Sequence, residues 1–104
     1  MEFVGFDLVV SIVDNRLTTD LLDRIEKVGV TGNTILPGRG RSSSKEIRLF
    51  GITIEPQRDC IITLTTRDKT KEIFDTIMEF GNLNKPGQGL VFVLEVKEVG
   101  GIRI

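Results

Sequence analysis

The sequence predicts an α+β fold of the ferredoxin-like type, in which two helices cover one face of a four-stranded antiparallel sheet. Two observations support this prediction. The chain has 104 residues, enough for one domain, 1–104, with one continuous core. Apolar residues gather in four extended segments and recur at helical spacing in two others. Their order along the chain is β-α-β-β-α-β.

The first half of the chain is predicted to contain a strand, a helix and a second extended segment. Phe3 to Val13 has the period of two expected of a strand. Every second residue on one face of this strand is apolar: Val4, Phe6, Leu8, Val10 and Ile12. Apolar residues then recur at helical spacing from Leu17 to Val28, and Gly29 is predicted to end this helix. Thr31 to Pro37 is predicted to be extended.

The second half repeats this pattern without repeating the sequence. Asp59 to Thr66 is predicted to be a strand. Asp68 is the expected N-cap of a helix that ends at Gly81. The final strand is predicted over Leu90 to Val99. The first and last strands are apolar on both faces, and contiguous exposed apolar patches are uncommon on monomers. We therefore expect other copies of the chain to cover the sheet.

Composition argues against several classes of function. The net charge of −1 gives no basis for binding nucleic acid, because such binding depends on contacts to phosphates. No segment approaches the ~20 apolar residues that cross a bilayer. The N-terminal run carries Glu2 and Asp7 and lacks a basic leader, so we expect a cytoplasmic location without direct membrane insertion. Cys60 is the single cysteine, which predicts no intrachain disulfide and a place in the core.

The same composition argues against an enzyme. The chain has no histidine, one cysteine and no carboxylate pair with helical spacing that faces a cleft. The usual general bases, thiol chemistry and zinc ligands are therefore missing. We expect no catalytic residue and no metal site built from these side chains.

Two glycine-marked segments are the strongest candidates for a ligand site. Gly38 to Arg41 has the sequence Gly-Arg-Gly-Arg, and Lys85 to Gly89 has the sequence Lys-Pro-Gly-Gln-Gly. Glycine lets the backbone approach an anion and point amide N–H groups at it, while arginine offers a planar fork of donors. These segments predict two parts of a phosphate site, although either one also fits an ordinary turn.

The spacing of further motifs resembles that of the PII signal-transduction proteins. In the first half, Glu26 to Thr34 (Glu-Lys-Val-Gly-Val-Thr-Gly-Asn-Thr) precedes the turn at Gly38 to Arg41. In the second half, Ile73 to Ile77, Lys85 to Gly89 and Val91 to Val96 look like that family's second helix, nucleotide loop and last strand. The resemblance covers nearly the whole chain in the right order.

The resemblance implies a homotrimer that binds an adenine nucleotide, ATP, ADP or AMP, in clefts between neighbours. Adenine would be read near Thr31 with Gly29 and the strand around Thr65, and phosphates would be held by Arg41, Arg103 and the second glycine loop. The residues that match the nucleotide site are Gly29, Thr31, Gly38, Gly40, Arg41, Thr65, Gly87, Gln88, Gly89 and Arg103.

The resemblance also implies that the excursion from Ser42 to Arg58 is a loop that regulates a protein partner, such as a membrane transporter or a metabolic enzyme. Its candidate contact residues are Ser42, Lys45, Arg48 and Phe50. Because the chain has no tyrosine, the uridylylation or adenylylation of many PII proteins is excluded at its usual residue type. An extra hairpin that packs on its own subunit is the alternative for this segment.

Two departures from the family pattern concern the effector. Leu90 stands where PII proteins carry a lysine, and Ser42 stands where they carry a glutamine. In the family these positions serve the complex of Mg-ATP with 2-oxoglutarate, so their joint loss argues against 2-oxoglutarate sensing. The sequence leaves open whether Mg²⁺ accompanies the nucleotide, which nucleotide is preferred and whether nitrogen metabolism is the pathway.

Simpler interpretations also fit individual residues and the whole chain. Thr31 fits an ordinary strand start, and Arg103 fits a solvated end residue. For the whole chain, the structural alternative is a non-signalling trimer of the copper-tolerance type. The catalytic alternative is an acylphosphatase-like enzyme, in which arginine and asparagine would orient a phosphoryl group, but the Gly38 turn lies at the wrong place for it.

Overall fold

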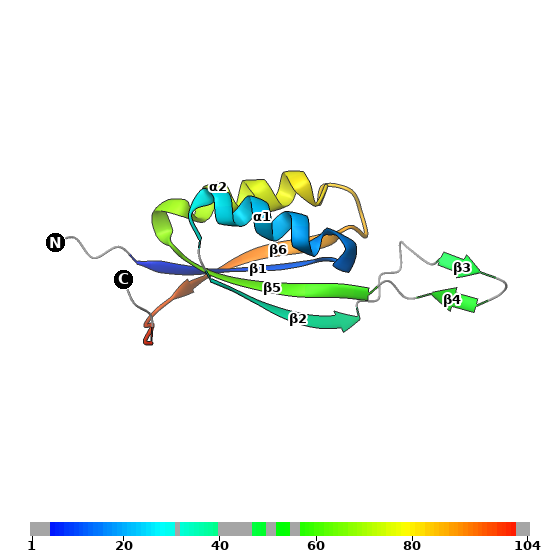
Figure 1. The fold of residues 1–104 in the computed structure, drawn as a ribbon, viewed down its shortest axis with the longest axis horizontal. Helices are drawn as coiled ribbons and strands as arrows, with labels where there is room; N and C mark the ends of the chain where they lie inside the picture. Colours follow the sequence, from blue (N-terminus) through cyan, green and yellow to red (C-terminus); the bar gives the residue numbers. More distant parts are fainter. Residues whose placement is uncertain (1–4, 31, 40–46, 50–51, 55–56, 102–104) are drawn as a thin grey trace.

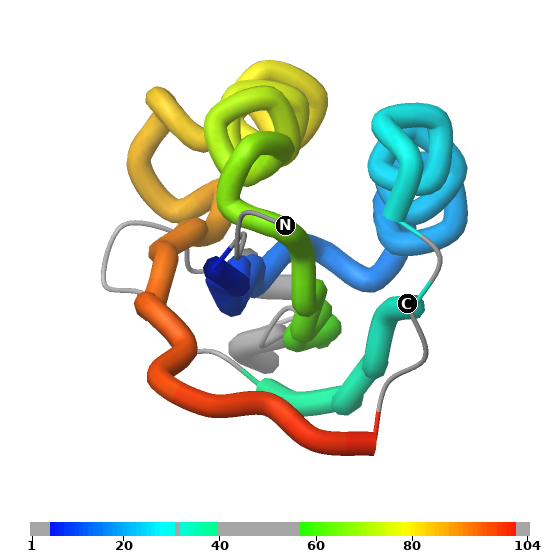
Figure 2. Tube along the Cα trace, turned by 90° about the vertical axis from the view of Figure 1, so that its left-hand side faces the viewer, coloured from blue at the N-terminus to red at the C-terminus, as the bar shows by residue number. Residues whose placement is uncertain are grey.

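A four-stranded antiparallel sheet, with strand order β2-β5-β1-β6, carries both helices on one face (Figure 1). The computed structural model describes residues 5–30, 32–39, 47–49, 52–54 and 57–101. Figure 2 shows the two helices side by side above the sheet. The elements are β1 (Phe6–Asp14), a 3₁₀ turn η1 (Asn15–Leu17), α1 (Thr18–Val28), β2 (Asn33–Arg39), β3 (Ile47–Leu49), β4 (Ile52–Ile54), β5 (Gln57–Thr66), α2 (Arg67–Phe80) and β6 (Gly89–Val96). The predicted α+β fold is therefore confirmed, with two additional short strands.

The hydrophobic core lies between the sheet and the helices. Its fully buried aliphatic residues come from β1, β5 and both helices: Val9, Val13, Leu21, Ile25, Ile61, Ile73 and Ile77. Each such side chain stabilises the fold by about 1.5–3 kcal/mol relative to an exposed one. In β1 the face toward the helices is the mixed one, which also carries buried Asp7 and Ser11. The more apolar face of β1 points away from the helices.

The end of α1 is as predicted, whereas the predicted start of α2 is wrong. Gly29 has φ 111° and ends α1 in the left-handed conformation, where glycine is favoured. Helix α2 begins at Arg67 with Thr66 as N-cap, so Asp68 lies in the first turn. There its carboxylate favours the helix through the macrodipole instead of capping it. The predicted end of α2 at Gly81 is confirmed.

Contacts with β1 explain why α2 starts directly after β5. The backbone N–H of Arg67 donates to the carbonyl of Gly5 at 2.9 Å. The buried carboxylate of Asp7 accepts hydrogen bonds from Arg67 Nε at 3.2 Å and from Thr70 Oγ1 at 2.7 Å. These partners satisfy a carboxylate that would be costly to bury alone. They fix the first turn of α2 on the sheet.

The strands also end at places that the hydrophobic pattern does not mark. β2 continues through Gly38 and Arg39, because these residues pair with Arg58 and Gln57 at the start of β5. Gly38 and Arg39 are therefore strand residues, and the rest of the predicted turn, Gly40 and Arg41, lies outside the described residues. β6 stops at Val96, whose partner Phe6 is the first residue of β1, so the prediction that it continues to Val99 is wrong.

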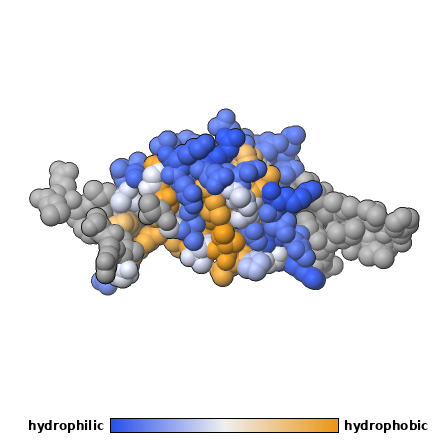
Figure 3. All heavy atoms as spheres, viewed as in Figure 1, coloured by the Kyte–Doolittle hydropathy of each residue, from blue (hydrophilic) through white to orange (hydrophobic). Residues whose placement is uncertain are grey.

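The sheet face opposite the helices, which we call the open face, is apolar, and its edge strands β2 and β6 leave large side chains exposed in the single chain. Along β2 and β6 it carries Leu36, Leu90, Phe92 and Leu94, which are 40% to 50% exposed. On β5, half-buried Cys60 shares this face, pairing with Ile12 and Leu36 instead of filling the core. Figure 3 shows apolar surface below the helices, over the sheet. This open face is what the sequence predicted from strands that are apolar on both sides.

Strands β3 and β4 pair as a hairpin between β2 and β5, so the predicted extra hairpin is present. Figure 1 shows it projecting past the end of the sheet, which contradicts the alternative that it packs on its own subunit. The projection helps to give the molecule extents of 61 × 24 × 21 Å. No helix within the described ranges is long and apolar enough to cross a membrane.

Candidate functional site

The described candidate residues fall into two groups at opposite ends of the sheet. Gly29 and Thr65 lie where β5 leads into α2, which we call the α2 end. Gly38 and the loop Gly87 to Gly89 lie where β2 and β5 connect to the β3–β4 hairpin, which we call the hairpin end (Figure 1). From Arg58 to Thr65, β5 spans about 23 Å at ~3.3 Å per residue. The structure does not bring the two groups together within one chain.

At the α2 end, Gly29 and the end of β5 are connected through α2. Lys69 Nζ in the first turn of α2 donates to the carbonyl of Gly29 at 3.4 Å. Thr65 is buried, and its hydroxyl donates to the carbonyl of Thr66 at 3.2 Å. The β2 ladder ends where Asn33 pairs with Thr63, so in the described part of the chain β5 has no strand partner on this side beyond Thr63. Among the described residues, this part of β5 is therefore a sheet edge.

At the hairpin end, the loop before β6 lies directly against β1. Gly87 has φ 79° and Gly89 has φ 146°, conformations that favour glycine. A Cβ atom added to Gly89 would lie 2.2 Å from the carbonyl oxygen of Ile12. Only glycine therefore fits at position 89 with this backbone.

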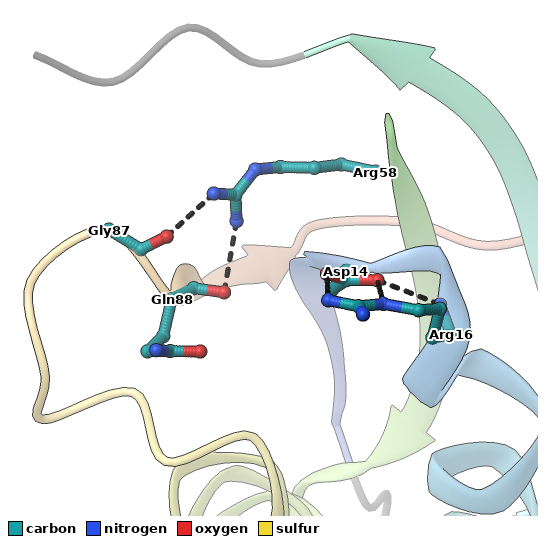
Figure 4. A network of polar contacts seen from close by, with 5 residues as sticks. All are labelled: Asp14, Arg16, Arg58, Gly87 and Gln88. Carbon is teal, nitrogen blue, oxygen red and sulfur yellow. Dashed lines mark hydrogen bonds and ion pairs between the residues drawn. The ribbon is translucent and has the colours of Figure 1, made fainter. Parts of the chain in front are cut away.

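Arg58 connects this loop to β5 (Figure 4). Arg58 is only 8% exposed. Its Nη1 donates to the carbonyl of Gln88 at 2.9 Å, and its Nη2 donates to the carbonyl of Gly87 at 2.6 Å. In the sheet, Arg58 pairs with Gly38 on one side and with Asp14 on the other. Sequence analysis assigned Arg58 to the regulatory loop, which is wrong, because it belongs to β5. Nothing in the local pattern distinguishes a buried arginine here from a solvated one.

A second arginine neutralises the acidic group beside Arg58. The carboxylate of Asp14 accepts hydrogen bonds from the Arg16 backbone N–H at 2.9 Å, from Nε at 3.0 Å and from Nη2 at 2.7 Å (Figure 4). These bonds to Arg16, with a smaller contribution from nearby Arg58, lower the pKa of Asp14 below its ordinary value of 3.8. The negative charge of Asp14 is therefore compensated within the chain.

Several predicted site residues lie outside the described residues, and their assignments stay predictions. Among the nucleotide residues these are Thr31, Gly40, Arg41 and Arg103. Among the loop residues these are Ser42, Lys45 and Phe50. Arg48 lies in β3, where it pairs with Thr53.

A metal centre of protein side chains is not present in the described part of the chain. No three histidine, cysteine, aspartate or glutamate side chains gather there in a way that could hold an ion.

Comparisons with known proteins agree with the fold and extend over the chain. A family model described as nitrogen regulatory protein P-II matches residues 6–104. The solved structure of Arabidopsis thaliana PII bound to citrate has a TM-score of 0.69 and 22% identity, covering 89% of this chain and 78% of that one. The structure of B. subtilis GlnK has a TM-score of 0.67 and 18% identity, covering 89% and 86% of the two chains. The comparison with curated proteins gives no match.

Proposed function

This chain belongs to the nitrogen regulatory protein P-II family of signal-transduction regulators, and on that premise we propose that it binds an adenine nucleotide between neighbouring copies of itself. We further propose that the bound nucleotide controls the segment between β2 and β5, which regulates a protein partner in the cytoplasm. The partner is a membrane transporter or a metabolic enzyme.

The division of the candidate residues between two ends of the sheet carries this proposal. The α2 end has Gly29 and Thr65, and the hairpin end, about 23 Å away at ~3.3 Å per residue, has Gly38 and Gly87 to Gly89. One nucleotide cannot contact both groups in the same chain. Two copies placed with the α2 end of one beside the hairpin end of the next would complete a site. Repeating this head-to-tail contact around a threefold axis closes a homotrimer.

The open sheet face supports the same assembly. Leu36, Leu90, Phe92 and Leu94 leave 40% to 50% of their surface in water in the single chain. Burying apolar surface contributes about 25 cal/mol per Å², so a contact between such faces would favour association. The open face extends from the α2 end of the sheet to the hairpin end. A contact between the open faces of neighbouring copies would therefore also bring the α2 end of one copy to the hairpin end of the next.

The chemistry of each half suits a different part of the nucleotide. At the α2 end, the free backbone edge of β5 and the hydroxyl of Thr31 would read adenine, which needs hydrogen bonds to its edge. At the hairpin end, the Gly87 to Gly89 loop would hold phosphates, and Arg41 and Arg103 are the arginines proposed to contribute to the same phosphate site. With Leu90 and Ser42 in place of the family's polar pair, we propose that the nucleotide itself is the signal and that 2-oxoglutarate adds little.

The projecting β3–β4 hairpin supports a regulatory role for this segment. It extends past the sheet, where a partner could contact it (Figure 1). Arg41 precedes the hairpin closely in sequence, so a phosphate that holds Arg41 would favour some hairpin conformations over others. By linkage, a partner that selects one of those conformations would change nucleotide affinity by the same factor.

Calorimetry and hydrogen exchange with ATP, ADP, AMP and no ligand test the proposal. We expect saturable nucleotide binding without turnover, and exchange of the amides at 47–49 and 52–54 that differs between ligand states. Turnover would instead favour the acylphosphatase-like alternative. Absence of binding would leave a scaffold of the copper-tolerance type, and identical exchange in all states would remove the regulatory switch.

Replacing Arg41 tests the phosphate role of the first glycine segment. Arg41→Ala is expected to weaken ATP binding by about 1.5–3 kcal/mol, the range of a charge-assisted hydrogen bond. Calorimetry measures this loss, and light scattering verifies that assembly is intact. The matched control is Arg39→Ala, because Arg39 is exposed at the end of β2 and should change affinity by less than about 0.5 kcal/mol. Equal losses in both variants would contradict a specific role for Arg41.

A further inference from the structure

Arg58 is a buried cation, and its hydrogen bonds to described residues go to the backbone of a single loop. Removing a guanidinium group from water costs several kcal/mol unless its N–H groups find partners. Within the part of the chain that the structure describes, two of them donate to the consecutive carbonyls of Gly87 and Gln88, at 2.6 Å and 2.9 Å. Carbonyls that accept bonds from a charged donor are held more firmly than those that accept from a neutral one.

These two bonds fix the orientation of the loop's peptide groups. In a planar trans peptide the C=O and the following N–H point in opposite directions. Arg58 therefore sets the direction of the N–H of Gln88 through Gly87, and that of Gly89 through Gln88. Within the loop, the N–H of Gln88 makes only a long contact of 3.4 Å with the carbonyl of Lys85. The loop alone holds that amide weakly.

The position of Arg58 in the sheet links the loop to the hairpin. Arg58 is the second residue of β5, and it pairs with Gly38, the second-last residue of β2. The chain leaves the sheet for the β3–β4 hairpin after β2 and returns at β5. A hairpin movement that shifts the end of this ladder would therefore move the Arg58 side chain and the carbonyls that it holds.

We propose that Arg58 is a positioning residue that holds the Gly87 to Gly89 loop in its phosphate-binding conformation and couples this loop to the hairpin. The inference rests on the proposed function, because it assigns a nucleotide role to the loop. Arg58 acts through the loop's backbone amides and does not itself need to touch the ligand.

Arg58→Met tests the inference, with Arg16→Met as the matched control. Both arginines lie at the hairpin end, but Arg16 is exposed and pairs with Asp14. In nucleotide-free protein, Arg58→Met should speed exchange of the amides at 87–89 by about tenfold or more, whereas Arg16→Met should not change it. In Arg58→Met, ATP affinity should fall by about tenfold and AMP affinity by less than about threefold. The effect on AMP is smaller because AMP has one phosphate for the loop to hold and ATP has three. The response of hairpin exchange to ATP should be lost.

Arg58→Lys keeps the inference testable if the methionine variant fails to fold. Lysine keeps the charge but cannot reproduce the fork that bonds two carbonyls, so its loop exchange should also be faster than that of the wild type. A purely structural role would lower the thermal midpoint and weaken ATP and AMP equally. That result, or unchanged loop exchange in either folded variant, would overturn the inference. A wild-type protein that bound no nucleotide would overturn the proposed function as well, whereas a folded variant with wild-type ATP affinity and hairpin response would overturn only the role of Arg58.

Discussion

Gly89→Ala is expected to destabilise the fold by on the order of 3 kcal/mol or more, because a left-handed backbone conformation costs about 1–3 kcal/mol for other residues and a clash is added to it. The φ of Gly89 is 146°, and a Cβ atom there would lie 2.2 Å from the carbonyl oxygen of Ile12. That oxygen belongs to β1, which pairs on both sides within the sheet. Neither backbone can move without breaking ladder hydrogen bonds.

Urea unfolding of Gly89→Ala and the wild type measures this loss. Gly38→Ala is the matched control, because Gly38 lies at the same end of the sheet and an added Cβ atom would meet nothing within 4 Å. We expect its free energy of unfolding to stay within about 1 kcal/mol of the wild type. A Gly89→Ala variant as stable as Gly38→Ala would show that the loop does not lie against β1 as described.

Leu94→Lys is expected to abolish assembly while leaving the single chain folded. Leu94 is 50% exposed on the open face and pairs with Leu8 of β1, an inner strand of the sheet. In a single chain the lysine ammonium can reach water from this position. In an assembly it would be buried against apolar residues, at a cost of several kcal/mol per contact. Since the proposed site needs two copies, nucleotide binding should disappear as well.

Light scattering, circular dichroism and calorimetry together measure this result. The control is Val93→Lys on the same strand, because Val93 is 39% exposed but faces the side of the sheet that carries the helices. We expect Val93→Lys to assemble and bind nucleotide like the wild type. If Leu94→Lys remained an intact trimer, the open face would not be the surface through which copies associate.

Hydrophobic periodicity predicted the fold, because apolar residues recur at one spacing in strands and at another in helices. Alternation predicted the strand β1, and helical spacing predicted α1, which contributes the fully buried Ile25 to the core. Alternation did not identify the core face of β1, because the fully buried Val9 lies on the mixed face. The predicted helix ends at Gly29 and Gly81 are also observed. In contrast, Asp68 had the expected identity for an N-cap, yet contacts of Arg67 with β1 start the helix earlier. Contacts between segments distant in sequence determine where α2 starts, and such contacts cannot be predicted from the local sequence pattern.

The candidate site was harder to predict, because a glycine can be required for backbone conformation or close packing as well as for ligand binding. The resemblance assigned Gly29 and Gly89 to the nucleotide, and the structure gives each an additional reason to be glycine. Gly29 ends α1 in the left-handed conformation, and Gly89 leaves room for the carbonyl oxygen of Ile12. The role of Arg58 could not be predicted, because its carbonyl partners lie about thirty residues away in sequence.

The proposed division of the nucleotide site between the two ends of the sheet has a consequence for genetics. A chain that is defective only at the α2 end keeps an intact hairpin end, and a chain defective only at the hairpin end keeps an intact α2 end. In a trimer that contains both kinds of chain, the intact hairpin end of one chain can meet the intact α2 end of the other at the same contact. Two inactive alleles expressed together would then restore nucleotide binding, although neither does so alone. A site contained within a single chain could not be completed in this way by a neighbouring chain.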